Sequence, residues 1–136
     1  ESMRLILGDI DATIREARAT NDPQLVQIAD RLRTGADALR EASEWMLSAM
    51  KERDQDKALA GATAYLALAG DVIGGHFLTR AATAARHGDD TAARARHLAL
   101  AGFFAETMLA MAPGRVPGIT GAGDAFLSSS EALFGV

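Results

Sequence analysis

The sequence predicts an all-α protein, and its composition and apolar spacing carry that prediction. Alanine supplies 29 of the 136 residues, whereas valine and isoleucine together supply only ten. Alanine is the strongest intrinsic helix former, and β-branched residues are the ones that strands collect. No stretch alternates apolar and polar residues between turn signals, as a half-buried strand would. We therefore expect an up-down four-helix bundle with a short C-terminal fifth helix, built by residues 1–136 as a single domain.

The first helix is expected over Met3–Thr20. Its apolar residues recur at spacings of three and four, which places them on one face of a helix: Leu7, Ile10, Ile14 and Ala17. The chain then turns at Asn21. Asp22 is expected to cap the next helix, and Pro23 suits the first turn of that helix, where its missing N–H would have no partner.

The second helix, expected over Pro23–Arg53, has the most regular pattern in the sequence. Apolar or small residues step by three and four from end to end: Leu25, Ile28, Leu32, Gly35, Leu39, Ala42, Met46 and Ala49. A seam of this length indicates a helix packed lengthwise in a bundle, although half of a dimeric coiled coil has the same pattern. We favour the bundle because short turns follow and because Gly35 and Ala42 are small for a two-stranded seam.

Two more long helices are expected after a break at Asp54-Gln55-Asp56. The third covers Lys57–Arg86, with these residues inward: Leu59, Ala62, Leu66, Ala69, Ile73 and Phe77. The run His87-Gly88-Asp89-Asp90 combines a helix stop with the cap of the next helix. The fourth covers Thr91–Ala112, with these residues inward: Ala95, Leu98, Gly102, Phe103 and Leu109.

The C-terminal part is expected to be a loop followed by one short helix. Pro113-Gly114 ends the fourth helix, and further prolines and glycines predict a loop over Pro113–Gly123. The last helix starts at Asp124, or at Ser128, which forms a capping-box pattern with Glu131. It carries four large apolar residues: Phe126, Leu127, Leu133 and Phe134.

Glycines inside the predicted helices point to close packing. Each glycine costs about 1 kcal/mol of helix stability relative to alanine in a helix interior. The glycines in question are Gly35, Gly61, Gly70, Gly74, Gly75 and Gly102. We interpret Gly70–Gly75 as a tight helix crossing and not as a ligand loop. The candidate rings that would pack against these glycines are Tyr65, Phe77, Phe103 and Phe104.

Charge and cysteine content exclude several function classes. Lys+Arg 14 against Asp+Glu 18 gives a net charge of −4, which argues against binding nucleic acid by phosphate neutralisation. The lack of cysteine excludes disulfides, a thiolate nucleophile, iron–sulfur clusters and zinc sites of the cysteine type. No uninterrupted apolar run approaches the roughly 18 residues of a membrane span, and no signal peptide is recognisable. We expect a cytoplasmic protein without a membrane span.

Titratable residues are not spaced for a metal or catalytic site. A di-iron bundle needs Glu-x-x-His pairs, and no glutamate here is followed by histidine three positions later. His87 lies at a helix end, where a cation interacts favourably with the last carbonyls, and no metal-ligand spacing links it to His76 or His97. His76 and His97 could meet one another or Glu106, but a buried structural histidine is favoured over a catalytic one.

Three further patterns are interpreted as structural. The run Gly118–Gly123 looks like a dinucleotide loop but follows a helix and a proline loop instead of a strand. Ser128-Ser129-Ser130 has no neighbouring histidine. Four arginines could bind an anion, although interspersed aspartates favour a solvated surface: Arg80, Arg86, Arg94 and Arg96. We therefore expect no catalytic, cofactor-binding or metal-ligating residue in this chain.

Small and aromatic residues follow one another in a fixed order through the second half of the chain. They are Ala64-Tyr65-Leu66-x-Leu68-x-Gly70-x-Val72-x-Gly74-Gly75, Arg80-Ala81-Ala82-x-Ala84-Ala85, Ala101-x-Phe103-Phe104-Ala105-Glu106-x-x-Leu109, Ile119-x-x-Gly121-Ala122 and Phe134. This order resembles the extra C-terminal helical domain of an acyl-CoA dehydrogenase subgroup similar to 3-methylmercaptopropionyl-CoA dehydrogenase. The resemblance covers nearly the whole chain and is specific from about Ala58 onward.

The resemblance implies that the parent protein is a flavoprotein oxidoreductase of fatty acid metabolism. That family oxidises acyl-CoA thioesters at the α,β-carbons, a CH–CH oxidation with a glutamate base and FAD as hydride acceptor. In the resembling enzymes the flavin and the glutamate belong to segments upstream of this domain, so no catalytic residue and no cofactor is carried over here. Four glutamates are accordingly not assigned the role of the base: Glu41, Glu44, Glu52 and Glu106.

The same resemblance predicts the partners. We expect residues 1–136 to be a domain excised from a longer enzyme, with Glu1-Ser2 as a cloning remnant, because the chain starts inside a predicted helix. Its partners would be the catalytic core of that enzyme and, through it, the acyl-CoA substrate. The alternative is a free-standing helical binding or signalling module that self-associates as a homodimer through the seam of the second helix.

Overall fold

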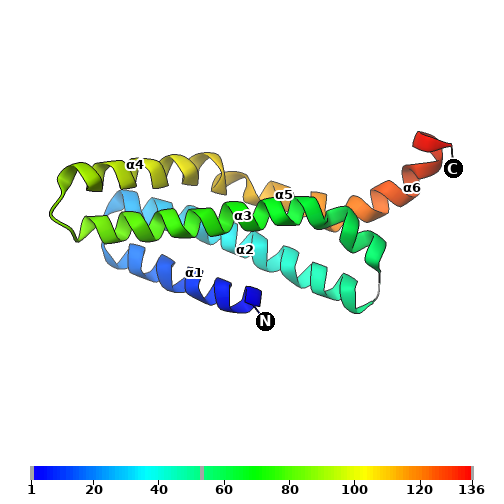
Figure 1. The fold of residues 1–136 in the computed structure, drawn as a ribbon, viewed down its shortest axis with the longest axis horizontal. Coiled ribbons are helices and arrows are strands. Elements are labelled where there is room, and N and C mark those ends of the chain that lie inside the picture. The colour runs from blue at the N-terminus through cyan, green and yellow to red at the C-terminus, as the bar shows by residue number, and fades with distance from the viewer. Residues whose placement is uncertain (1, 53, 136) are drawn as a thin grey trace.

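The computed structural model describes residues 2–52 and 54–135, apart from the side chains of residues 126, 127, 130 and 131. Within this part the chain forms helices and no strand (Figure 1), so the all-α prediction is confirmed. The elements are α1 (Ser2–Ala19), α2 (Pro23–Lys51), α3 (Gln55–Arg86), α4 (Thr91–Thr107), the 3₁₀ turn η1 (Leu109–Met111), α5 (Ala112–Thr120) and α6 (Ala122–Phe134).

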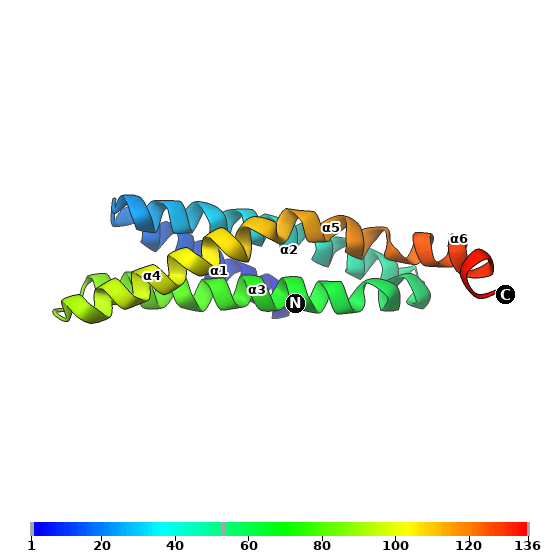
Figure 2. The ribbon, with the colours of Figure 1, turned by 90° about the horizontal axis from the view of Figure 1, so that it is seen from above.

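The two longest helices, α2 and α3, form the centre of the molecule. They lie along each other, with α1 on one side and the row of α4, η1 and α5 on the other (Figures 1 and 2). α2 and α3 each contact α1, α4 and α5, whereas the described residues of α1 contact neither α4 nor α5. α6 contacts α3 and α5 and extends past the turn between α2 and α3 (Figure 1). Every helix is therefore anchored on α3.

Aspartate caps start α2, α3 and α4 where the sequence predicts them. The Asp22 carboxylate accepts from the backbone N–H of Gln24 at 2.9 Å, Asp54 accepts from Lys57 N–H at 3.2 Å, and Asp90 does the same for α4. Asn21 closes the turn before α2 with a φ of 56°, in the left-handed region that asparagine tolerates better than most residues. The starts of these helices consequently agree with the prediction to within two residues.

The predicted faces of the first two helices are confirmed. Every residue of the α2 seam is buried except Met46, which is half-buried, and α1 buries its four predicted residues: Leu7, Ile10, Ile14 and Ala17. Burying an aliphatic side chain of this size contributes about 1.5–3 kcal/mol. Because the α2 seam is filled by helices of the same chain, it is not available for a dimeric coiled coil, and that interpretation of the seam is wrong.

The predicted inward face of α3 is wrong in part. Leu59, Leu66 and Phe77 are exposed, while Ala69 is buried and the two other predicted residues, Ala62 and Ile73, are half-buried. α3 buries a different face, which consists largely of small residues: Gly61, Leu68, Val72, Gly75, Thr79 and Ala82. Small side chains let α2 and α5 approach closely, and that packing determines which of two apolar faces turns inward.

The C-terminal third differs most from the prediction. α4 ends at Thr107 and not at Ala112, and it rests on its neighbours through the buried Ala101 and Ala105. Of the residues predicted to face inward, Leu109 is buried but lies in η1. Ala95 and Phe103 are exposed, and Leu98 and Gly102 are half-buried. At the end of α4 the Thr107 hydroxyl donates a hydrogen bond to the Phe103 carbonyl, one turn earlier in the helix, at 2.7 Å.

Residues 113–123, predicted to form a loop, are largely helical. Pro113 stands in the first turn of α5, where a missing N–H costs nothing, and Val116 and Ile119 are buried against the centre of the molecule. α6 starts at Ala122, so both predicted starts, Asp124 and Ser128, are wrong. The side chains of Phe126, Leu127 and Glu131, and with them the capping box, lie outside the described residues, while Leu133 and Phe134 are exposed.

Candidate functional site

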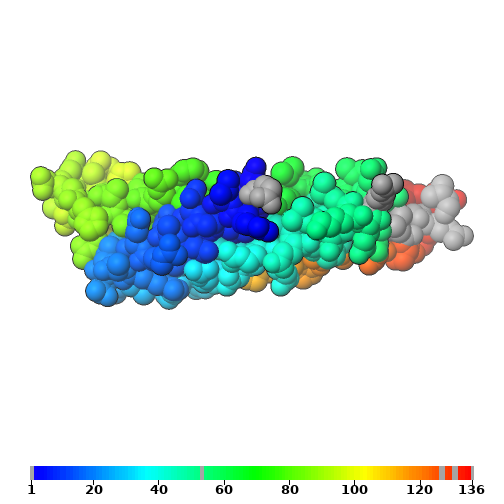
Figure 3. Space-filling view, turned by 90° about the horizontal axis from the view of Figure 1, so that it is seen from below, coloured from blue at the N-terminus to red at the C-terminus, as the bar shows by residue number. Residues whose placement is uncertain are grey.

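A groove of about 710 Å³ lies between the C-terminal parts of α1 and α3. Its lining includes Glu16 and Ala19 of α1 and Phe77, Arg80 and His87 at the end of α3. Figure 3 shows the face on which α1 lies across α2 and α3 and stops midway along them. Among the described residues no hydrogen bond or ion pair joins Glu16, Arg80 and His87, so the groove does not hold an assembled acid–base pair.

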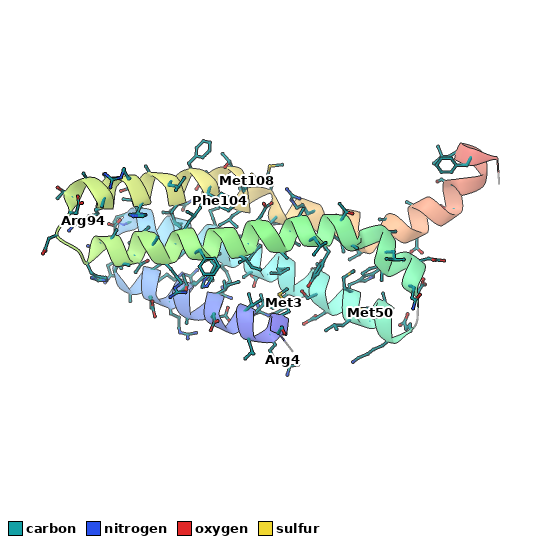
Figure 4. The ribbon with its side chains drawn as sticks, viewed as in Figure 1. Met3, Arg4, Met50, Arg94, Phe104 and Met108 are labelled. Carbon is teal, nitrogen blue, oxygen red and sulfur yellow. The ribbon has the colours of Figure 1, made fainter. Side chains whose placement is uncertain are left out.

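A second groove, of about 630 Å³, separates the N-terminal part of α1 from α2. Met3 and Arg4 line it on the α1 side (Figure 4). Its carboxylate Asp11 is held by Arg33 at 2.9 Å and by Arg40 at 3.4 Å. These contacts tie α1 to α2, which is a structural use of the charges.

His76 is the one titratable side chain that is buried in the described part of the chain, with 5% exposed. Burial lowers the pKa of His76, the positive charge of Arg80 lowers it further, and the Asp9 carboxylate acts in the opposite direction. Its Nδ1 atom has no hydrogen-bond partner, and its ring contacts that of Phe77 with 5.0 Å between centroids. The structure therefore places His76 as a neutral packing residue between α1 and α3.

Among the described residues no hydrogen bond or ion pair joins His76 and His97 to one another, or either of them to Glu106, a contact that the sequence left open. Glu106 instead turns toward α2, where it accepts from Gln27 at 3.1 Å and pairs with Arg31 at 3.0 Å. The hydrogen bonds from Arg31 and Gln27 lower the pKa of Glu106. This carboxylate is exposed and fixes α4 to α2, and it is not positioned as a base.

Of the four arginines considered for an anion site, Arg94 holds the turn between α3 and α4, and Arg86 joins the end of α3 to the cap of α2. Arg94 donates to the Gly88 carbonyl at 2.8 Å (Figure 4), and Arg86 pairs with Asp22 at 3.6 Å. Arg80 and Arg96 are exposed. His87 caps the end of α3 through its backbone N–H, as the predicted helix end requires. These side chains hold the end of the bundle together and do not converge on one point.

The glycine run Gly118–Gly123 is not a phosphate-binding loop, because it spans the end of α5 and the start of α6. Its glycines serve packing. A Cβ atom added to Gly123 would stand 2.8 Å from Cα of Lys57, so α6 approaches α3 at backbone distance. Lys57 also pairs with Asp124 at 3.3 Å, which fastens the same junction.

The glycines of α3 mark crossings at two of the three positions in the predicted cluster. A Cβ on Gly75 would stand 2.7 Å from the Leu109 side chain, and one on Gly74 would stand 3.4 Å from the ring of Phe104, which faces α3 from α4 (Figure 4). Gly70 has nothing within 4 Å of its Cβ position. The crossing interpretation is therefore confirmed for Gly74 and Gly75 and wrong for Gly70.

No nucleophile or metal centre is assembled among the described residues. Ser128 donates to the Ala125 carbonyl at 3.2 Å inside α6, a bond typical of a helical serine. No three side chains of His, Asp or Glu in this part of the chain gather closely enough to hold a metal ion. The described part of α3 also carries three large apolar side chains that are exposed: Leu59, Leu66 and Phe77.

Sequence reasoning missed these residues as a surface because it assigned them to the core. Leu59, Leu66 and Phe77 belong to a regular apolar pattern, and the pattern alone is typical of a packed face. The signal that distinguishes them is a second face of small residues on the same helix, centred on Val72 and Gly75. A helix with two apolar faces can contact two neighbours.

A known protein family matches this chain over most of its length. The model of the family described as acetyl-CoA dehydrogenase C-terminal like matches residues 6–129, which is most of the chain. Neither a curated protein nor a solved structure matches this chain significantly.

Proposed function

This chain belongs to the acetyl-CoA dehydrogenase C-terminal-like family, and from that premise we propose that it is the C-terminal structural domain of an FAD-dependent acyl-CoA dehydrogenase. The match over residues 6–129 is the observation that carries the proposal. The ordered small and aromatic residues from Ala64 to Leu109 support the subgroup similar to 3-methylmercaptopropionyl-CoA dehydrogenase. The lack of cysteine fits a cytoplasmic parent enzyme.

We further propose that the domain follows an up-down four-helix plan in which the fourth rod is composite. α1, α2 and α3 are single helices, whereas α4, η1 and α5 together run back along α2 and α3. The contacts of α4 and α5 with both central helices support this plan. The 3₁₀ turn absorbs the change in direction within the fourth rod.

The residues of this chain do not fit FAD. A pyrophosphate binds best at a free helix N-terminus that follows a glycine loop. Here the first amides of α2, α3 and α4 are taken by the carboxylates of Asp22, Asp54 and Asp90, whose negative charge repels a phosphate. The glycine run at residues 118–123 is folded into helices. In this proposal the groups that oxidise the acyl-CoA thioester at its α,β-carbons belong to the preceding part of the parent enzyme.

The domain's contribution is a rigid helical body that packs on the catalytic core and takes part in shaping the acyl-CoA entrance or the subunit contacts. Its buried core and its interhelical ion pairs, such as Asp11 with Arg33 and Asp71 with Arg115, give it that rigidity. The α2 seam that a free-standing self-associating module requires is filled within the chain, which disfavours that alternative.

Flavin retention tests the proposal. The protein encoded by the full reading frame should purify yellow with FAD bound and should oxidise acyl-CoA thioesters, whereas residues 1–136 alone should purify colourless and fail to bind added FAD in an equilibrium titration. Stoichiometric FAD on the isolated chain, or a reading frame that encodes no flavin-binding core before Met3, contradicts the proposal.

A further inference from the structure

One face of α3 carries large apolar side chains that the described residues of the other helices leave exposed. Leu59, Leu66 and Phe77 expose 71%, 68% and 57% of their surface, and Gly70 between them has nothing within 4 Å of its Cβ position. We name these four residues the α3 outer stripe. α2 and α5 pack on a different face of the helix, so the stripe is free of both. Large apolar side chains exposed together on one helix face mark an interaction site.

The spacing within the stripe fits a helical partner. Leu59 and Leu66 are seven residues apart, as are Gly70 and Phe77, and the second pair follows the first after a step of four from Leu66 to Gly70. Two interleaved heptad positions form the seam along which a second helix packs lengthwise. A glycine in a helix interior is unfavourable unless a neighbour approaches there, and no neighbour within the described chain approaches Gly70.

The charge pattern indicates that this partner is apolar. Between Ala58 and Thr79 the one Asp, Glu, Lys or Arg residue of α3 is Asp71, which pairs with Arg115 of α5 at 3.0 Å, and the one histidine, His76, is buried. The stripe therefore offers nothing to a phosphate or to a charged peptide. By length and composition alone α3 could cross a membrane, and 28% of its most apolar window is buried. Its contacts with α2 and α5 along the other face favour a protein partner over lipid.

The position of the stripe points to the preceding part of the polypeptide. Phe77 also lines the groove beside Glu16 and Ala19, so the stripe is continuous with the contact between α1 and α3. α1 starts about midway along α3 (Figures 1 and 3), so a segment that leads into α1 reaches this face directly. In the proposed function the catalytic core is that preceding segment.

We infer that a helix of the catalytic core, which precedes Ser2 in the same polypeptide, packs along the α3 outer stripe and docks the domain on the core. The inference rests on the proposed function and adds the surface and the secondary structure of its partner. Leu59, Leu66 and Phe77 fit between side chains of the core helix, and Gly70 lets the two backbones approach.

Site-specific photo-cross-linking in the full-length enzyme tests the inference. A benzoyl-phenylalanine replaces Leu66 in one variant and Leu100 in the other, since Leu100 is comparably exposed, at 53%, but lies on α4. The adducts are mapped by mass spectrometry in enzyme that retains FAD and activity. We expect the probe at position 66 to react with a helix preceding Ser2 in the same polypeptide, and the probe at position 100 to leave that helix unmodified.

Other results overturn the inference. These are adducts at position 66 to a second copy of the chain or to added lipid vesicles, the same core adduct from both positions, or no adduct at position 66. Limited proteolysis of the full-length enzyme is a second measurement. Leu66→Asp should make the domain more susceptible to cleavage than it is in the unsubstituted enzyme, whereas Leu100→Asp should leave its susceptibility unchanged. A full reading frame without a flavin core defeats the proposed function, whereas a flavin core that is not cross-linked to position 66 defeats this inference alone.

Discussion

Gly61 of α3 lies so close to Ile119 of α5 that a Cβ atom on the glycine would stand 2.6 Å from the Ile119 carbonyl oxygen. The obstacle is backbone, which cannot rotate away as a side chain can. Ile119 is itself fully buried, so α5 cannot retreat without exposing it. The contact explains why glycine stands inside a helix at this position and why residues 112–120 fold onto α3.

Gly61→Ala should destabilise the chain by roughly 1–3 kcal/mol, because the added methyl group forces α3 and α5 apart. Gly70→Ala is the matched control, since its Cβ position is open and alanine is the better helix former. That variant should stabilise the isolated chain by up to about 1 kcal/mol. Urea denaturation followed by circular dichroism measures both. Equal effects of the two substitutions would contradict the close approach of α5.

The stability of the chain should fall as the pH drops below the ordinary pKa of histidine, 6.5. Burial lowers the pKa of His76 in the folded state, so the unfolded chain binds the proton more tightly. The stability that neutral His76 provides is present above 6.5 and is lost as the pH falls toward the lowered value. His76→Gln should reduce this loss between about pH 7.5 and pH 5.5, as measured by thermal unfolding. His87→Gln, at the exposed end of α3, should retain it because His76 is still present.

Sequence reasoning succeeded where one apolar face competed with polar ones. The α2 seam from Leu25 to Ala49 has a single apolar face, and that face is buried. It failed on α3, where Leu59, Leu66 and Phe77 form as good a pattern as the small residues that are buried. Periodicity ranks the larger side chains higher, whereas the folded chain selects the face that permits closer packing.

The C-terminal third could not be predicted from local signals for a different reason. Pro113, Pro117 and their neighbouring glycines favour a loop, and the helix they form depends on burying Val116 and Ile119 against residues far away in the sequence. Tertiary burial outweighs the local cost of Pro117 inside α5. The α3 outer stripe could not be predicted for a related reason, because the exposure of its residues depends on the tertiary packing of the helices.

Breaking the Asp71–Arg115 ion pair should cost more than breaking an exposed one. The pair joins α3 to α5 at 3.0 Å, and the Asp71 side chain is only 18% exposed. Arg115→Ala would leave this carboxylate without its partner, and we expect a loss of about 1–3 kcal/mol in the free energy of unfolding. Arg18→Ala removes the exposed pair with Asp30 and should cost no more than about 1 kcal/mol. Similar losses for the two variants in urea unfolding, or a loss for Arg115→Ala that salt abolishes, would show that the half-buried pair contributes no more than the exposed pair.

The isolated chain should distinguish Leu66 from Leu68, which lie two residues apart on α3. Leu68 is fully buried, so Leu68→Ala removes core contacts and should destabilise by about 2–5 kcal/mol. Leu66 is largely exposed, and Leu66→Ala should change the stability of the isolated chain by no more than about 0.5 kcal/mol. Both are measured by urea unfolding of residues 1–136, where no catalytic core is present. A large loss for Leu66→Ala in this setting would mean that its side chain is covered within the chain itself, and the α3 outer stripe would then not be available to a partner.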